Sequence, residues 1–102
     1  MDMIKTILCV CGSGIGTSLM MRLNVESVIE ELEYKDIVVL HSSIKDAKDI
    51  QADLFVIGKD GYNHFKNKEK MIVIRNLLDR DEMYIKLKKA LQSQERQFCI
   101  ID

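Results

Sequence analysis

Short apolar runs alternate with amphipathic stretches along this chain. We interpret the runs as strands, because parallel strands covered on both faces carry continuous apolar sequence instead of an alternating pattern. The runs lie at residues 4–10, 37–40, 54–57 and 71–74. Strands that alternate with helical segments in this way are typical of βαβ units around a parallel sheet.

Helices are predicted between and after these strands. Over residues 17–33 the apolar residues recur on one helical face, at Met21, Val25, Val28, Ile29 and Leu32. Two capping pairs, Ser43 with Asp46 and Asp79 with Glu82, predict a short helix through residues 44–50 and a final helix over 80–94. Residues 59–70, rich in Lys, Asn and Gly, predict a loop with one turn of helix.

These elements favour one α/β fold. Right-handed crossovers predict a single-domain, four-stranded parallel sheet, doubly wound and Rossmann-like, with strand order 2-1-3-4 and helices on both faces. We expect one domain over residues 1–102. Its core would occupy about residues 4–94, and residues 95–102 would form a C-terminal tail.

Composition limits the classes of function. The chain has 102 residues, with 15 Lys and Arg against 16 Asp and Glu, so its charge gives no overall attraction for nucleic acid or an anionic membrane. Any bound anion must be held by a local site. The longest apolar run, residues 7–11, is far shorter than the ~18 residues of a membrane span. Three cysteines and no export signal predict free thiols in a reducing cytoplasm.

The turn after the first predicted strand carries the clearest functional signal. Its residues are Cys11, Gly12, Ser13, Gly14, Ile15, Gly16, Thr17 and Ser18. Three glycines in five residues let the backbone turn its N–H groups inward, and the following helix adds about half a positive charge at its N-terminus. This predicts a phosphate cradle made from backbone amides. The three hydroxyls can add donors, and Thr17 or Ser18 can cap the helix.

Cys11 stands at the mouth of this cradle. The amides and the helix dipole favour its thiolate form, which predicts a nucleophile that attacks phosphorus. The alternative is that Cys11 closes a buried strand and that the glycines serve packing alone. Cys9 faces the same side deeper in the sheet and is interpreted as a small core residue. Cys99, in the terminal apolar stretch, is interpreted as incidental.

Other motifs fit less well. The glycines run G-x-G-x-G instead of G-x-G-x-x-G, and no acidic residue closes the second strand, which weakens a dinucleotide site. A Walker loop needs lysine where Gly16 is followed directly by Thr17. Cys9-Val10-Cys11 is a C-x-C sequence with no second ligand pair, so we expect neither a metal site nor a cofactor.

The tyrosine phosphatase loop, Cys-x5-Arg-Ser/Thr, uses the same strand, cradle and helix. Here the position of its arginine is occupied by Thr17. The cradle therefore lacks the guanidinium that would clamp the phosphoryl oxygens during hydrolysis. A phosphorylated thiol should persist long enough to be handed on, which a carrier needs and a hydrolase does not.

Residues 7–21, from Ile7 through the glycine turn to Met21, resemble the phosphorylation-site loop of the IIB components of the bacterial sugar phosphotransferase system (PTS). The ascorbate-type branch is the most similar and the galactitol type comes next. A second stretch, Val73-Ile74-Arg75-Asn76-Leu77-Leu78, also resembles the ascorbate type. The likeness extends over about residues 4–94.

The resemblance implies a relay. A phosphohistidine on a IIA partner would pass its phosphoryl group to Cys11, which would donate it to a sugar bound in the membrane-embedded IIC transporter. The protein would be a cytoplasmic protein-phosphohistidine:sugar phosphotransferase, associated transiently with the inner membrane face through IIC. It would neither bind nucleic acid nor insert into the membrane. The alternatives are a phosphorylation-sensing regulatory module and a low-molecular-weight tyrosine-phosphatase-like hydrolase.

Residues outside the loop give weaker signals. Ile15 could face partner proteins or pack against the last helix. Arg75 and Asn76 follow the fourth strand on the rim of Cys11, where they could contact phosphate or where Arg75 could pair with Asp79 or Asp81. Helix capping explains Asp79 more simply than general-acid chemistry. His41 and His64 are interpreted as surface histidines.

Overall fold

The computed structural model describes residues 4–12, 15–65 and 68–101, and within these residues five strands form one parallel sheet. The elements follow one another as β1 (Thr6–Cys11), α1 (Ile15–Glu31), β2 (Val38–Ser43), α2 (Ile44–Ala47), β3 (Leu54–Gly58), the 3-10 helix η1 (Lys59–His64), β4 (Lys70–Ile74), α3 (Arg80–Gln92) and β5 (Phe98–Ile100). The α/β class and the alternation of strands and helices are confirmed.

The strand order is β2-β1-β3-β4-β5, with every neighbouring pair parallel. The predicted order 2-1-3-4 is confirmed, and the predicted count of four strands is one short. The fifth strand, β5, pairs with β4 through Met71 opposite Cys99, and the Phe98 N–H donates to the Glu69 carbonyl at 2.8 Å. Only three residues long and partly exposed, β5 lacks the continuous buried pattern of β1, β3 and β4.

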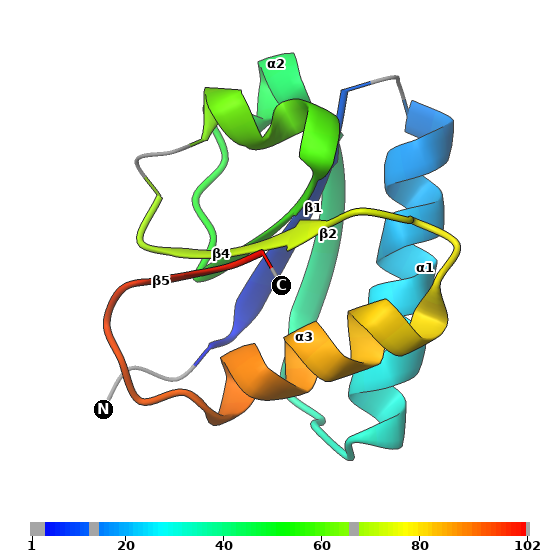
Figure 1. The fold of residues 1–102 in the computed structure, drawn as a ribbon, viewed down its shortest axis with the longest axis vertical. Helices are drawn as coiled ribbons and strands as arrows, with labels where there is room; N and C mark the ends of the chain where they lie inside the picture. Colours follow the sequence, from blue (N-terminus) through cyan, green and yellow to red (C-terminus); the bar gives the residue numbers. More distant parts are fainter. Residues whose placement is uncertain (1–3, 13–14, 66–67, 102) are drawn as a thin grey trace.

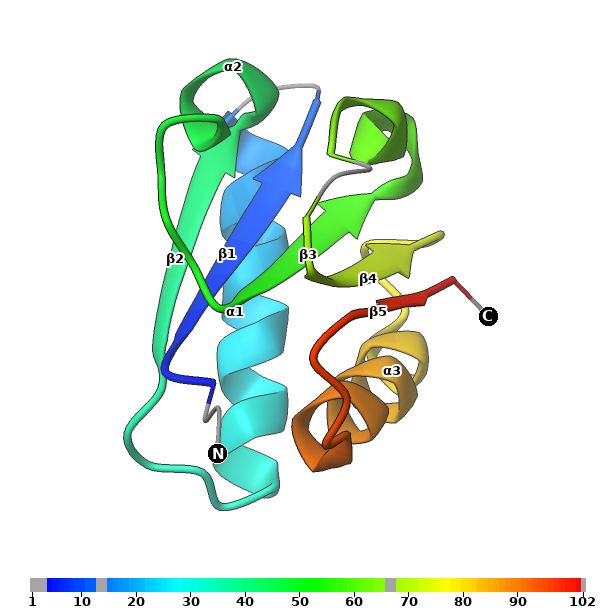
Figure 2. The ribbon, with the colours of Figure 1, turned by 90° about the vertical axis from the view of Figure 1, so that its left-hand side faces the viewer.

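Helices cover both faces of the sheet, as predicted. The long helices α1 and α3 pack side by side on one face, and α2 and η1 lie on the other near the upper end of the sheet (Figures 1 and 2). Successive residues of β1 alternate between these layers: Ile7, Cys9 and Cys11 join the core under α1 and α3, while Leu8 and Val10 face α2 and η1. Cys11 therefore lies on the α1 side of the sheet.

The helix α1 ends two residues before the predicted position. Glu33 has a left-handed φ of 66°, and the Tyr34 N–H donates to the Ile29 carbonyl at 3.1 Å. The Glu33 N–H in turn donates to the Glu30 carbonyl at 3.0 Å. These bonds form a Schellman motif, which closes the helix without glycine and turns the chain toward β2.

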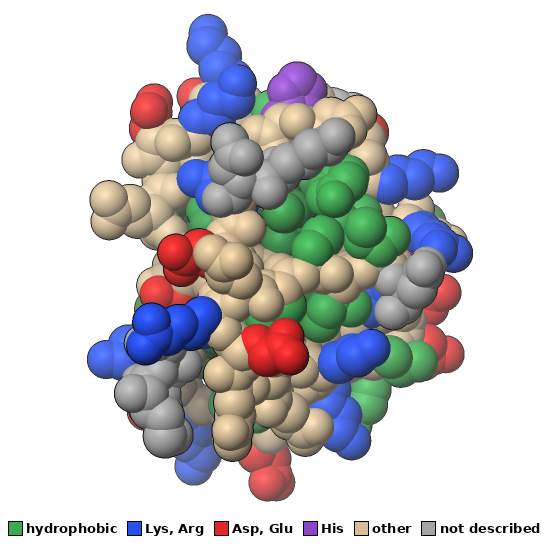
Figure 3. Space-filling view, turned by 60° about the vertical axis from the view of Figure 1, so that its left-hand side comes forward, with side chains coloured by type: hydrophobic (Ala, Val, Ile, Leu, Met, Phe, Trp, Pro, Cys, Tyr) green, Lys and Arg blue, Asp and Glu red, His purple; other side chains and the backbone are tan. Residues whose placement is uncertain are grey.

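The second face is less completely covered beyond η1. A hollow of about 320 Å³ lies beside β4 and β5 and is lined by Tyr62, Lys68, Glu69, Met71, Gln97, Phe98 and Cys99. Figure 3, which views the molecule from this side, shows a patch of hydrophobic side chains at the surface. Cys99 is exposed there and forms a hydrogen bond with the Tyr62 side chain, which raises the pKa of Tyr62. This bond connects η1 to the edge strand.

A buried lysine ties α3 to the sheet and to the end of the chain. Lys86 is 5% exposed, and its Nζ donates to the Val73 and Ile101 carbonyls at 2.7 and 2.6 Å and to Glu82 Oε2 at 2.6 Å. The Glu82 carboxylate also accepts from the Arg75 and Asn76 N–H groups at 2.8 and 2.9 Å. The ion pair thus fixes the loop between β4 and α3.

The Glu82 carboxylate should make stability depend on pH. Burial by itself would raise its pKa, but the hydrogen bonds from Arg75, Lys86 and Asn76 outweigh burial and lower the pKa below its usual 4.5. A carboxyl whose pKa falls on folding stabilises the protein above its unfolded pKa, and this contribution is lost as pH falls through the folded value. The free energy of unfolding in urea should therefore drop below about pH 4.5, and Glu82→Gln should weaken that drop. An equal drop in both proteins would contradict this assignment.

None of the described helices combines the length and apolar character that crossing a lipid bilayer requires.

Candidate functional site

The carboxyl ends of β1 and β3 meet at one edge of the sheet. Cys11 is the last residue of β1 and Gly58 the last of β3. At this edge α1, α2 and η1 all begin, as the upper part of Figure 1 shows. In open parallel α/β sheets this edge is where ligands bind.

Cys11 ends β1, as the sequence predicted to within one residue, and α1 begins at Ile15. Its side chain is 3% exposed and belongs to the core beneath α1 and α3, and it has interactions within the fold. The next residue, Gly12, is exposed. The exposed backbone at Gly12 forms the rim of the candidate site at this end of β1.

The helix α1 begins within the glycine turn that the sequence predicts to be a phosphate cradle. It runs for 17 residues with no acidic residue in its first turn, whereas the first turn of α3 holds Asp81 and Glu82. The positive end of the α1 dipole is therefore not compensated from within its own first turn and is available to an anion. Ser13 and Gly14 lie outside the described residues, as does the side chain of Ile15.

The remaining predicted cradle residues lie in the first turn of α1. Gly16 is exposed, and among the described residues nothing would lie within 4 Å of a β-carbon added to it. Thr17 is half-buried and Ser18 fully buried, and both have partners within the fold. Among the described residues, the space beside Gly16 is therefore open, whereas the Ser18 side chain lies inside the protein.

Cys9 has the character of a core residue. It is fully buried two residues before Cys11 on the same face. Burial raises the pKa of its thiol far above the usual value, and Glu26 raises it further against a smaller opposing effect of Arg22. Cys9 is therefore held as a neutral thiol, and a neutral thiol is a poor nucleophile.

Asp60, an acidic residue that was not predicted to be part of the site, also lies at this rim. A β-carbon at Gly12 would lie 2.7 Å from Asp60 Oδ2, and one at Gly58 would lie 2.8 Å from Asp60 Oδ1 and 3.9 Å from Cys11 Sγ. The carboxylate at the start of η1 thus fits against both glycines. Its sequence signal was weak, since Asp60 stands in a segment that is predicted to be a polar loop.

Comparison with known proteins identifies the family. The family model described as "PTS system, Lactose/Cellobiose specific IIB subunit" matches residues 6–94, which include β1, the glycine turn and every helix of the described residues. The chain belongs to the PTS IIB family. The resemblance that the loop suggested is therefore confirmed at the level of the family, and the chain is a component of the sugar phosphotransferase type.

Two individual proteins resemble this PTS IIB protein over most of their length. The ascorbate-specific PTS system EIIB component of Mycoplasma pneumoniae is 28% identical over 88 residues, covering 83% of this chain and 93% of the relative. The lactose-specific IIB domain of Streptococcus pneumoniae has the same fold, with a TM-score of 0.59 at 17% identity. That comparison covers 87% of this chain and 92% of the other.

The residues after β4 in the PTS IIB protein have structural partners. The Asp79 side chain accepts from the Glu82 N–H at 3.1 Å and caps α3, which confirms the capping prediction. Ser43 caps α2 in the same way by accepting from the Asp46 N–H at 3.3 Å. The N–H groups of Arg75 and Asn76 bind Glu82, as described above.

The two histidines of the PTS IIB protein lie in different surroundings. His41 pairs with Cys9 across β1 and β2, is half-buried, and lies with its Nδ1 3.2 Å from Arg22 Nη1. His64 ends η1 and is exposed, as expected for a surface histidine. The interpretation of His41 as a surface histidine is thus only partly right, because its ring contacts α1.

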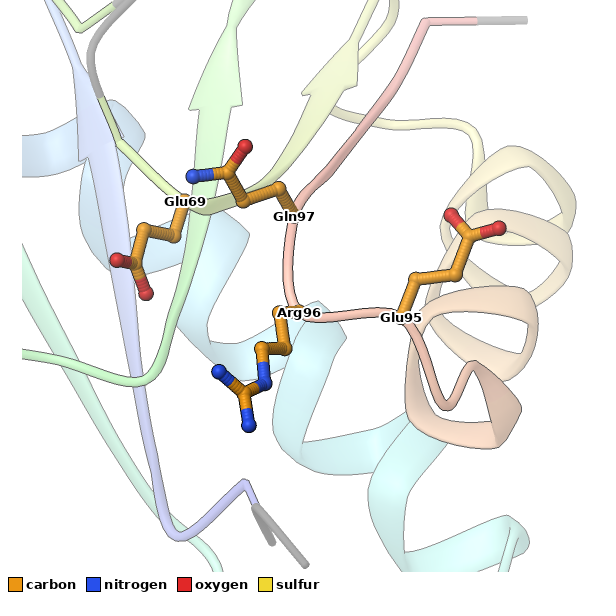
Figure 4. Close-up of a pocket in the computed structure, with 4 residues that line it drawn as sticks. All are labelled: Glu69, Glu95, Arg96 and Gln97. Atoms are coloured by element: carbon orange, nitrogen blue, oxygen red, sulfur yellow. The ribbon is translucent and has the colours of Figure 1, made fainter.

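A hollow of about 620 Å³ lies at the opposite end of the sheet, among Glu69, Glu95, Arg96 and Gln97 (Figure 4). Glu69 precedes β4, and the other three residues precede β5, so the hollow lies at the amino ends of these parallel strands. It is therefore separate from the rim that carries Cys11. We place the candidate site of this PTS IIB protein at Cys11 because strand, helix terminus and thiol meet there.

Proposed function

We propose that Cys11 carries a phosphoryl group from a phosphohistidine on a IIA partner to a sugar bound in a membrane-embedded IIC transporter. The observation that carries this proposal is the position of Cys11 at the end of β1, shortly before α1, whose first turn holds no acidic residue. A thiol at this point is beside a site suited to an anion. Membership of the PTS IIB family supports the same role.

The transfer to Cys11 is a displacement at phosphorus. The Cys11 thiolate attacks, the S–P bond forms, and the N–P bond of the phosphohistidine breaks. The electron pair of that bond stays on the histidine nitrogen, which takes up a proton to leave as neutral imidazole, so that the proton given up by the thiol is balanced by the one gained by the imidazole. In the second step the sugar hydroxyl attacks the phosphocysteine, so that an O–P bond replaces the S–P bond, and the hydroxyl proton is released to solvent or to the departing sulfur as Cys11 returns to its free form.

We assign the binding of the phosphoryl oxygens to the residues that follow Cys11. Backbone N–H groups at a helix N-terminus and in the preceding turn are suited to three negatively polarised oxygens. The residues proposed for this role are Gly12, Ser13, Gly14, Ile15, Gly16, Thr17 and Ser18. Because Ser18 is buried, its hydroxyl acts from the inner side of the turn, while Gly16 leaves the outer side open.

The first turn of α1 also supports transfer in preference to hydrolysis. The residue six positions after Cys11 is Thr17, so this turn has no guanidinium to stabilise a water-attack transition state. The phosphocysteine should therefore survive until an acceptor hydroxyl arrives. The chain handles the phosphoryl group, and the choice of sugar belongs to the transporter.

The test is transfer from a phosphorylated IIA protein, with the label located by mass spectrometry of the digested chain. We expect one phosphoryl group on the peptide that contains Cys11, bound through sulfur. Label on another residue, or no transfer from any IIA protein encoded beside a matching IIC transporter, would overturn the proposal. Release of free phosphate faster than transfer to sugar would instead favour the hydrolase.

Replacing Gly16 should raise the stability of the protein and slow its phosphorylation. Gly16→Ala places a methyl group in open space within a helix, so we expect the free energy of unfolding to rise by up to about 1 kcal/mol. The same methyl group narrows the approach to the cradle, and phosphorylation by IIA should slow by about tenfold. Urea denaturation and rapid-quench transfer measure the two effects. Glu30→Ala, on the exposed part of α1, is the matched control. An unchanged transfer rate in Gly16→Ala would show that this space is not used.

A further inference from the structure

The carboxylate of Asp60 occupies the rim of the phosphate cradle. Its two oxygens lie against the two glycines that end β1 and β3, since β-carbons at Gly12 and Gly58 would be 2.7 and 2.8 Å from them. Distances this short are not found between real atoms of this kind, so any other residue at either position would have to displace Asp60. The two glycines therefore leave space for this carboxylate.

The same carboxylate is close to the reacting sulfur. A β-carbon built on Gly58 would lie 2.8 Å from Asp60 Oδ1 and 3.9 Å from Cys11 Sγ, so the carboxylate and the sulfur both lie next to the same point at the end of β3. A phosphoryl group on the sulfur brings up to two negative charges and three oxygens into this space. Because Asp60 is exposed on the rim, its charge acts on that group through the solvent-facing side of the cradle.

An acidic residue here opposes the attraction that the rest of the cradle provides. The N-terminus of α1, whose own first turn holds no acidic residue, attracts anions. A negative charge on the rim repels them, and the repulsion energy is twice as large for a doubly charged anion as for a singly charged one. A carrier benefits from this balance. Tight binding of free phosphate would block the empty site, and tight binding of the phosphocysteine would delay its transfer onward.

We propose that Asp60 is a specificity residue that weakens the hold of the cradle on doubly charged phosphate. It excludes free phosphate dianion from the empty site and keeps the phosphoryl group on Cys11 ready to leave. The proposal rests on the proposed function for the benefit of this weakening, but the anion binding itself is measured without any phosphotransfer.

The experiment compares two tetrahedral oxyanions of similar size and different charge. Tungstate carries two negative charges and perrhenate carries one, and their dissociation constants are measured by the amide shifts of Cys11 and Gly12 in nuclear magnetic resonance. We expect Asp60→Asn to bind tungstate about tenfold more tightly than the wild type and perrhenate about threefold more tightly at low salt. Both gains should shrink as ionic strength rises. A role in space-filling alone would change the two anions equally.

The matched control removes the same charge from the other end of the sheet. Asp36 is exposed ahead of β2, and Asp36→Asn should leave both dissociation constants unchanged. If Asp60→Asn does not fold, Asp60→Ser removes the charge with a smaller side chain and is measured in the same way.

Several outcomes would overturn the proposal. One is an equal gain in affinity for tungstate and perrhenate in Asp60→Asn, and another is an equal change in affinity in Asp36→Asn and Asp60→Asn. The others are weaker tungstate binding by Asp60→Asn than by the wild type, or no tungstate binding by either of these two proteins. Phosphorylation of Cys11 by IIA is measured in parallel on the wild type. Transfer without a tungstate effect would reject the role of Asp60 and keep the carrier function. A tungstate effect without transfer would support the role of Asp60 and reject the carrier function.

Discussion

Cys11→Ser is expected to abolish phosphoryl transfer, lowering its rate by at least about a thousandfold. A serine hydroxyl in this position keeps the shape of the side chain but is hardly ionised near neutral pH, so the attack on phosphorus loses its thiolate. The measurement is the rate at which radiolabelled phosphate moves from IIA to the chain, followed by rapid quench.

Cys9→Ser is the matched control for this prediction. It changes the same atom two residues earlier on the same face, where the fully buried thiol is held neutral. We expect its transfer rate to stay within a few-fold of the wild type, with a loss of stability of about 1–3 kcal/mol for burying a hydroxyl. A large loss of transfer in Cys9→Ser together with retention in Cys11→Ser would exchange the roles of the two cysteines.

Lys86→Met is expected to cause the largest loss of stability, about 3–5 kcal/mol, because it removes one partner of a buried ion pair. The substitution deprives Glu82 of its partner at 2.6 Å and leaves the carbonyls of Val73 and Ile101 without their ammonium donor. The measurement is urea denaturation followed by circular dichroism, at a pH where Glu82 is ionised.

The matched control lies on the same helix. Lys89 is exposed in the last turn of α3, and Lys89→Met should change the free energy of unfolding by less than about 0.5 kcal/mol. Similar losses in both variants would mean that the buried ion pair contributes no more than a surface charge. Cys11 should still accept phosphate in the fraction of Lys86→Met that is folded, since Lys86 bonds to α3, β4 and the end of the chain.

The strands and caps could be predicted because their signals are local. The strands β1, β3 and β4 contain continuous apolar runs, and Ser43 and Asp79 bond to N–H groups three residues away. The strand β2 begins with an apolar run but continues through three polar residues to Ser43, so the predicted end at residue 40 is three residues short. The strand β5 also lies in an apolar stretch, but it is only three residues long and partly exposed, and the sequence alone does not distinguish it from an apolar tail. Lys86 did leave a signal, since it lies three residues after Met83 and four before Ala90 on the buried face of α3.

The candidate site likewise contains residues that a local pattern predicts and one residue that it does not. Cys11 and the glycine turn are contiguous in sequence, so their chemistry could be proposed from the order of the residues alone. Asp60 joins them from 48 positions beyond Gly12, through a contact that exists only when β1 and β3 lie side by side. A local sequence pattern cannot show that two residues so far apart in the chain come together in the fold.

The strand order β2-β1-β3 determines how the chain leaves the sheet beside Cys11. The chain leaves β1 toward one neighbour, β2, and then crosses to the other side of β1 to form β3. The connections after β1 and β3 therefore leave the sheet on opposite faces, α1 on one and η1 on the other, and the proposed phosphoryl site lies where they part. The loops after β2 and β4 border the same edge without supplying the thiol, so sequence change there can alter which proteins dock while the transfer chemistry stays the same.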